Sequence, residues 1–93
     1  MRLKTMDALN ECFNEAKNTN ARYIGVAVKI DGMDGVEVII NSIENYSYKK
    51  AYYNSVYDMG LEHRHADGIR IVGCAFGNTY DEIEEQLNFE FSY

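Results

Sequence analysis

The chain has 93 residues and contains neither proline nor a run of about 18 apolar residues that could cross a membrane. Its first residues also lack the apolar segment of a secretory signal. We therefore expect a cytoplasmic protein that does not bind membranes. Internal repeats, linkers and low-complexity segments are absent as well, so residues 1–93 are expected to form a single domain.

Basic residues are scarce. Nine Lys and Arg residues stand against fifteen Asp and Glu residues, which gives a formal net charge of −6. This balance disfavours direct binding to nucleic acid or to an anionic membrane. It permits binding to a basic protein surface, including one that normally holds nucleic acid.

Sequence motifs of common enzymes are also missing. The chain has no phosphate-binding glycine loop, no nucleophile elbow and no H-E-x-x-H motif. Cys12 and Cys74 lack the spacing of metal ligands, and we expect two buried free thiols rather than a disulfide. Cys74 lies in an apolar strand, where a thiol is unreactive. We expect no enzymatic activity and no cofactor.

The fold is organised around residues 69–87, which combine an apolar strand, a turn and a capped helix. The strand, residues 69–76, is apolar on both faces, which is typical of a strand that is covered on both sides. Thr79 offers a hydroxyl to the start of the helix, and Glu82 follows at the spacing of a capping box. The expected buried face of this helix carries Tyr80, Ile83 and Leu87.

Hydrophobic periodicity predicts the remaining elements. Two helices are expected at residues 6–17, capped by Thr5, and at residues 42–59, regular from Tyr46 and ended by Gly60. Two strands, residues 21–30 and 36–41, are joined by a glycine-rich hairpin loop. Residues 61–68 form a polar connection, and the tail, residues 88–93, forms either an edge strand or an aromatic clamp.

These elements predict an α+β fold in the order α-β-β-α-β-α. A right-handed crossover places the third strand beside the first and parallel to the second. We expect a small mixed sheet of three strands, or four if the tail adds one, with the helices packed mainly on one face.

The second face of this sheet is expected to be apolar. If the registers hold, it carries Tyr23, Gly25, Ala27, Ile39, Val72, Cys74 and Phe76. So much apolar surface requires a cover. A helix, the aromatic tail or a second subunit could supply it, and we expect a homodimer in which two sheets pack together.

Two kinds of site are suggested by the sequence. The helix at 42–59 carries more tyrosines than one buried stripe needs, and tyrosine is enriched in protein interfaces. The expected partner-binding residues are Tyr46, Tyr53, Tyr57, Asp81, Glu84 and Glu85. Alternatively, His63, His65 and Asp67 could bind a metal ion or small ligand, since histidines two positions apart point the same way in an extended segment.

One short pattern resembles a known family. Gly73-Cys74, Gly77, Thr79-Tyr80 and Glu82 are similar to the end of a HicB-type antitoxin domain, where a strand ending in Gly-Cys leads into an acidic helix. The resemblance implies this local structure and an antitoxin-like regulator. The chain departs from the family pattern because it begins with a helix and has a long helix before its third strand. In composition it also resembles small proteins of Firmicutes, their prophages and phages.

Taken together, these features lead us to expect a small acidic, non-enzymatic module that binds another protein. A phage-type accessory protein or inhibitor would suit its size and charge. A ligand-binding or metal-binding domain and an antitoxin-like regulator are the alternatives.

Overall fold

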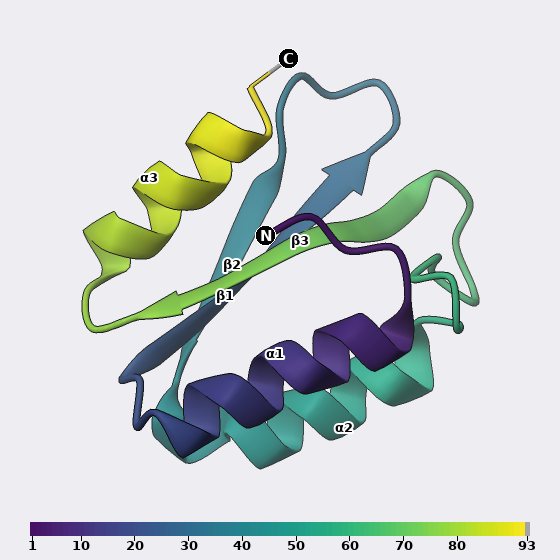
Figure 1. Ribbon diagram of the computed structural model, residues 1–93. Coiled ribbons are helices and arrows are strands. Elements are labelled where there is room, and N and C mark those ends of the chain that lie inside the picture. The colour runs from purple at the N-terminus through teal and green to yellow at the C-terminus, as the bar shows by residue number, and fades with distance from the viewer. Residues whose placement is uncertain (93) are drawn as a thin grey trace.

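The computed structural model describes residues 1–92 and confirms an α+β fold with the expected element order (Figure 1). The helices are α1 (Met6–Asn18), α2 (Tyr46–Val56) and α3 (Tyr80–Glu90), with a short 3₁₀ turn, η1 (Ile43–Asn45), before α2. The strands are β1 (Tyr23–Ile30), β2 (Glu37–Ser42) and β3 (Ile69–Gly77). Thr5 and Thr79 cap α1 and α3 as expected, each accepting a hydrogen bond from a backbone N–H three residues later. Across the described residues, no helix has the length and apolar character needed to cross a membrane.

The three strands form a sheet in the order β2-β1-β3, as predicted. The expected mixed sheet is wrong, because both neighbouring pairs are antiparallel. β3 does run parallel to β2, but β1 lies between them, so no parallel pair is hydrogen-bonded. All hydrogen-bonded strand pairs of the described sheet are therefore antiparallel.

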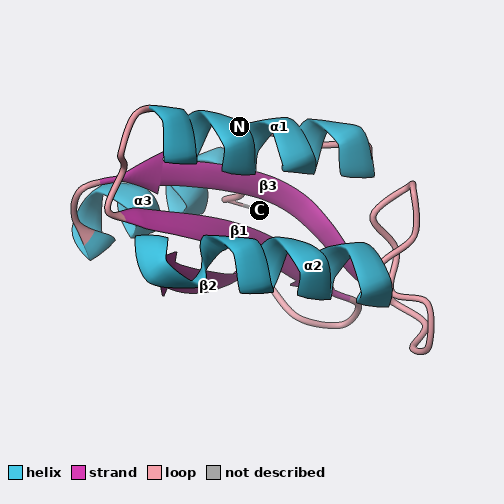
Figure 2. Ribbon diagram, turned by 90° about the horizontal axis from the view of Figure 1, so that it is seen from below, coloured by secondary structure: helices cyan, strands magenta, loops and turns pink. Residues whose placement is uncertain are grey.

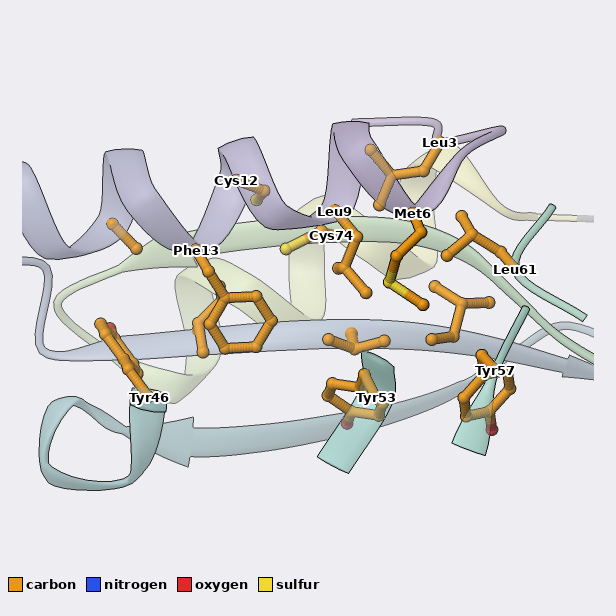
Figure 3. Close-up of a cluster of buried hydrophobic side chains, with 14 of the residues drawn as sticks. Leu3, Met6, Leu9, Cys12, Phe13, Tyr46, Tyr53, Tyr57, Leu61 and Cys74 are labelled. Atoms are coloured by element: carbon orange, nitrogen blue, oxygen red, sulfur yellow. The ribbon is translucent and has the colours of Figure 1, made fainter. Parts of the chain in front are cut away.

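Helices cover both faces of the sheet, two on one side and one on the other (Figures 1 and 2). α1 and α2 pack on one face, where Figure 3 shows α1 side chains meeting tyrosines of α2. We call the buried residues on this side the α1–α2 cluster. α3 covers the other face through Ile83, Leu87 and Phe91, which pack on Ala27 and Ala75.

A β-bulge in β3 changes which side chains face α3. The register between β1 and β3 shifts at Ala27 and Val28, so Ala27 lies opposite Gly73 while Val28 lies opposite Ile71. The unpaired residue, Val72, faces the α3 side. Because a bulge reverses the alternation beyond it, Cys74 lies with Ile71 in the α1–α2 cluster.

Three assignments to the second face are therefore wrong. Cys74 and Phe76 lie on the α1–α2 side because of the bulge, and Ile39 lies there because it is opposite Val26. Directly opposed residues of an antiparallel pair share a face. The remaining assignments, Tyr23, Gly25, Ala27 and Val72, do lie toward α3.

Two glycines allow α3 to approach the sheet closely. A Cβ atom on Gly25 would lie 2.3 Å from Cγ2 of Ile83, and one on Gly73 would lie 2.4 Å from the ring of Phe91. Real side chains do not come this close, so only glycine fits beneath α3 at these positions. The second face is thus covered within the chain, which removes the reason for expecting two sheets to pack face to face.

The second helix ends three residues before the expected end. α2 stops at Val56, and Tyr57 is extended and pairs with His63. Asp58 then organises a turn, since its Oδ1 accepts hydrogen bonds from the N–H groups of Gly60 and Glu62 at 2.9 and 3.0 Å. Local side-chain bonds of this kind compete with helix continuation, so Gly60 is not the helix end.

The tail does not add a strand. α3 continues through residues 88–90, and Phe91 is its buried C-cap residue, while Tyr93 lies outside the described residues. The expected aromatic clamp is therefore partly right, because Phe91 packs on the sheet. The outer edge of β3 is instead covered by residues 1–3 and 61–63. Leu3 N–H donates to Val72 O at 2.9 Å, and His63 N–H donates to Ile69 O at 2.9 Å.

Candidate functional site

The helix α3 holds most of the net charge of the protein. The helix contains Asp81, Glu82, Glu84, Glu85 and Glu90 and no Lys or Arg. It therefore accounts for five of the six net negative charges, and the rest of the chain is nearly balanced. Asp81, Glu84 and Glu85 are all exposed, as a partner-binding surface requires.

The carboxylate at the end of this helix is held by two hydrogen bonds. Glu90 Oε1 lies 2.5 Å from the Met1 ammonium and accepts a bond from Gln86 at 3.2 Å. Burial acts to raise the pKa of Glu90, but these bonds prevail and the pKa lies below its usual value. Glu90 is thus ionised at neutral pH, and its charge is paired with the Met1 ammonium.

An exposed aromatic side chain lies among these carboxylates. Phe89 is 85% exposed, the largest exposure of any large apolar residue in the described chain. Glu82, Glu85 and Phe89 share one helix face at the spacing i, i+3, i+7, and with Gln86 and Glu90 they line a shallow depression. We call this surface the α3 outer face.

Phe89 was not among the expected site residues, because residues 88–93 were assigned to a separate tail. The signal was present in the spacing. Ile83 and Leu87 mark the buried stripe, and a helix extended past Leu87 turns position 89 to the opposite side.

The tyrosines expected to bind a partner are buried. Tyr46, Tyr53 and Tyr57 are at most 6% exposed and belong to the α1–α2 cluster (Figure 3). Two other tyrosines of α2, Tyr48 and Tyr52, are instead 73% and 42% exposed. The folded protein therefore does not present the first three tyrosines to a partner.

The error is one of helix phase. The buried stripe of α2 runs from Tyr46 to Tyr53 and on to Tyr57, with the half-buried Lys49 and Lys50 between them. The Lys49 ammonium lies 5.3 Å from the centre of the Tyr53 ring, so its stem covers the core while its charge reaches solvent. Two lysines within the stripe conceal its period.

Tyr46 and Tyr53 differ in whether their buried hydroxyl groups have a hydrogen-bond partner. Tyr46 donates a hydrogen bond to Ala21 O at 2.6 Å, and burial raises its pKa to about 12. The Tyr53 hydroxyl has no hydrogen-bond partner among the described residues, and burial raises its pKa further. A buried hydroxyl without a partner lowers stability, whereas a bonded one does not.

We expect Tyr46→Phe and Tyr53→Phe to change stability in opposite directions. Tyr46→Phe leaves the Ala21 carbonyl without its donor and should lower the free energy of unfolding by about 1–2 kcal/mol. Tyr53→Phe removes the unsatisfied hydroxyl and should be neutral or raise it by up to about 1 kcal/mol. Urea denaturation of both variants measures the difference, and equal losses would contradict the assignment.

His63, His65 and Asp67 do not come together as a set of metal ligands. His63 Nδ1 accepts a hydrogen bond from the His65 N–H at 3.0 Å, and its ring packs edge-on against Tyr57 at 5.2 Å. His65 and Asp67 are exposed. Within residues 1–92, no three His, Cys, Asp or Glu side chains are grouped closely enough to bind a metal ion. His63 acts here as a structural residue of the loop.

A polar cavity of about 250 Å³ does lie beside this loop. Its lining includes Asp31, Asp58, Glu62, Arg64 and Arg70 together with His63 and Asp67. Four carboxylates and two guanidinium groups surround it, so its lining is acidic overall. It is the candidate site for the ligand-binding alternative.

The two cysteines are free and buried, as predicted. Burial raises the pKa of Cys74 well above its usual value, and a hydrogen bond with Cys12 adds to this rise. Cys74 is therefore a neutral thiol at physiological pH, which leaves it without nucleophilic character.

Comparison with known proteins identifies no relative: no protein-family model, no curated protein and no solved structure matches this chain.

Proposed function

We propose that this protein is a non-enzymatic binding module whose α3 outer face binds a basic surface of another protein. The observation that supports this proposal is the concentration of charge, since one helix of eleven residues carries five of the six net negative charges. Diffuse acidity would serve solubility alone. Charge gathered on one helix orients an approaching basic partner and raises its rate of association.

The aromatic residue supplies a second element of such an interface. Phe89 projects from a surface otherwise lined by carboxylates and Gln86. Interfaces commonly combine an aromatic anchor with a polar rim. A partner with basic side chains around an apolar hollow would fit both features. A phage-type inhibitor that blocks a nucleic-acid-binding surface, or an antitoxin-like regulator, would have this kind of partner.

A charge-matched pair of variants tests the proposal. Glu82→Gln with Glu85→Gln removes two charges from the α3 outer face, and Glu11→Gln with Glu15→Gln removes two from the exposed side of α1. Each bait is used to capture proteins from a lysate of the source organism. We expect a basic protein to be retained by the wild type and the α1 variant, and roughly tenfold less by the α3 variant.

Two results would count against the proposal. Equal loss in both variants would mean that net charge, and not the α3 outer face, attracts the captured protein. Capture of no protein in stoichiometric amount by the wild type would remove the basis for a binding role. Phe89→Ala gives an independent reading, because it should weaken retention without changing the charge.

A further inference from the structure

The two edges of the sheet differ in whether other segments form backbone hydrogen bonds with them. On the β3 edge, residues 1–3 bond to Val72 and Cys74, and residues 61–63 bond to Ile69 and Ile71. On the β2 edge, no described segment forms a backbone hydrogen bond with residues 37–42 outside the ladder to β1. One edge of the sheet is thus closed, and the other presents unpaired backbone groups.

β2 also carries few of the features that prevent edges from pairing. Natural edge strands carry lysine, proline or a bulge that blocks a second strand. β2 contains none of these, since its sequence is EVIINS and its register with β1 is unbroken. Val38, Ile39 and Ile40 are each only half-buried, although the corresponding residues of β1 are fully buried. The strand is apolar and incompletely covered.

We propose that β2 pairs with β2 of a second copy, antiparallel and about a two-fold axis at Ile39, to form a continuous six-stranded sheet. Closed two-fold pairs are the commonest oligomers. The pairing closes the open edge and covers the half-buried side chains of β2. It is an edge-to-edge dimer and does not depend on the proposed function of α3.

The register follows from the faces of β2. Ile39 packs toward the α1–α2 cluster, and Val38 and Ile40 pack toward α3. Opposed residues must share a face, so the axis passes through one residue of the strand. With the axis at Ile39, Val38 lies opposite Ile40 of the other copy and Glu37 lies opposite Asn41. This register matches apolar with apolar residues and polar with polar residues.

The distribution of charge permits this dimer despite the net charge of each copy. Glu37 is the single charged residue of β2, and it faces an uncharged residue in the proposed register. α3 lies mainly over β3 and β1. Two such helices would be about four strand spacings apart, roughly 20 Å, which is beyond a Debye length of about 10 Å at 0.1 M salt.

Light scattering of the wild type and two charge variants tests the proposal. The wild type should show twice the chain mass of 10.7 kDa at a concentration of about 100 μM, since weaker pairing would have no role at cellular levels. Glu37→Lys with Asn41→Lys places like charges opposite each other at both ends of the pairing. It should raise the dissociation constant about tenfold or more.

Glu37→Lys with Asn41→Glu is the matched control, because it changes the same two positions but opposes unlike charges. It should dimerise at least as well as the wild type. A monomeric wild type would overturn the proposal. A dimer that responds equally to both variants would also overturn it, because the dimer would then use another surface.

Hydrogen exchange provides a reading that needs no variant. The outward amides of residues 37–41 should exchange more slowly as the concentration of the wild type rises, while those of the hairpin loop at 31–35 should not change. Exchange rates in β2 that are independent of concentration would contradict edge pairing.

Discussion

Adding one methyl group at Gly25 is expected to lower the free energy of unfolding by roughly 2–3 kcal/mol. The new Cβ atom would stand 2.3 Å from Cγ2 of Ile83, a methyl group on a stiff β-branched side chain. To relieve this clash, α3 must move away from the sheet. Gly73→Ala should have a similar effect, since its Cβ atom would meet the ring of Phe91 and the Met1 carbonyl at 2.4 and 3.0 Å.

Two further variants make this prediction specific. Gly60→Ala is the control, because its nearest neighbour would be Asp58 Oδ1 at 3.6 Å, and it should change stability by less than about 0.5 kcal/mol. Ile83→Leu removes the clashing Cγ2 methyl, so adding it to Gly25→Ala should restore roughly 1–2 kcal/mol. Denaturation of the four proteins measures these values. If Gly25→Ala leaves the free energy of unfolding unchanged, α3 does not pack as closely on the sheet as described.

Truncating Leu61 should lower the free energy of unfolding by about 3 kcal/mol, with Ala and Gly almost equally harmful. Leu61 is 1% exposed and packs in the α1–α2 cluster, yet its φ of 65° lies in the left-handed region. Gly adopts this conformation without strain, whereas Ala does not. In Leu61→Gly, the loss of backbone strain in the folded state should offset the greater conformational entropy that glycine gives the unfolded chain.

Leu9 provides the matched control. It has the same exposure and belongs to the same cluster, but it lies within α1. There Leu9→Gly should be worse than Leu9→Ala by about 1 kcal/mol, because glycine disfavours a helix. Urea denaturation of the four variants gives both differences. If Gly is worse than Ala by the same margin at Leu61 and Leu9, the positive φ at Leu61 is not a source of strain.

Local signals in the sequence were sufficient for the order of elements and for the sheet. Thr5 and Thr79 marked the starts of α1 and α3, and the hairpin loop at 31–35 placed β2 beside β1. The right-handed connection then predicted β3 on the other side of β1. Each of these signals depends on residues close together in the chain or on a general rule of handedness.

The faces of the elements were harder to predict, because they depend on contacts between distant residues. The bulge at Val72 shifts the alternation of β3, and nothing in an apolar run distinguishes its two faces. Tyrosine fits both a core and a surface, so the phase of α2 was ambiguous. The need for glycine at positions 25 and 73 depends on α3 lying above them, and α3 is distant in the sequence.

For the candidate site, the sequence identified the acidic residues of α3 and missed Phe89. The carboxylates could be predicted because charged side chains on a helix face solvent. Phe89 could not, because an apolar residue near the end of a chain is usually expected to pack, as Phe91 does. Its exposure depends on α3 continuing to Glu90.

The central pairing of the sheet has a consequence for the speed of folding. Residues joined between β1 and β3 lie 39 to 54 positions apart in the chain, whereas the hairpin pair Val28 and Glu37 lies nine apart. Loop closure makes distant pairs form more slowly. The hairpin should therefore form before β3 docks, and during this interval β1 has an unpaired apolar edge. Aggregation during refolding should then increase with protein concentration and decrease once β3 has docked.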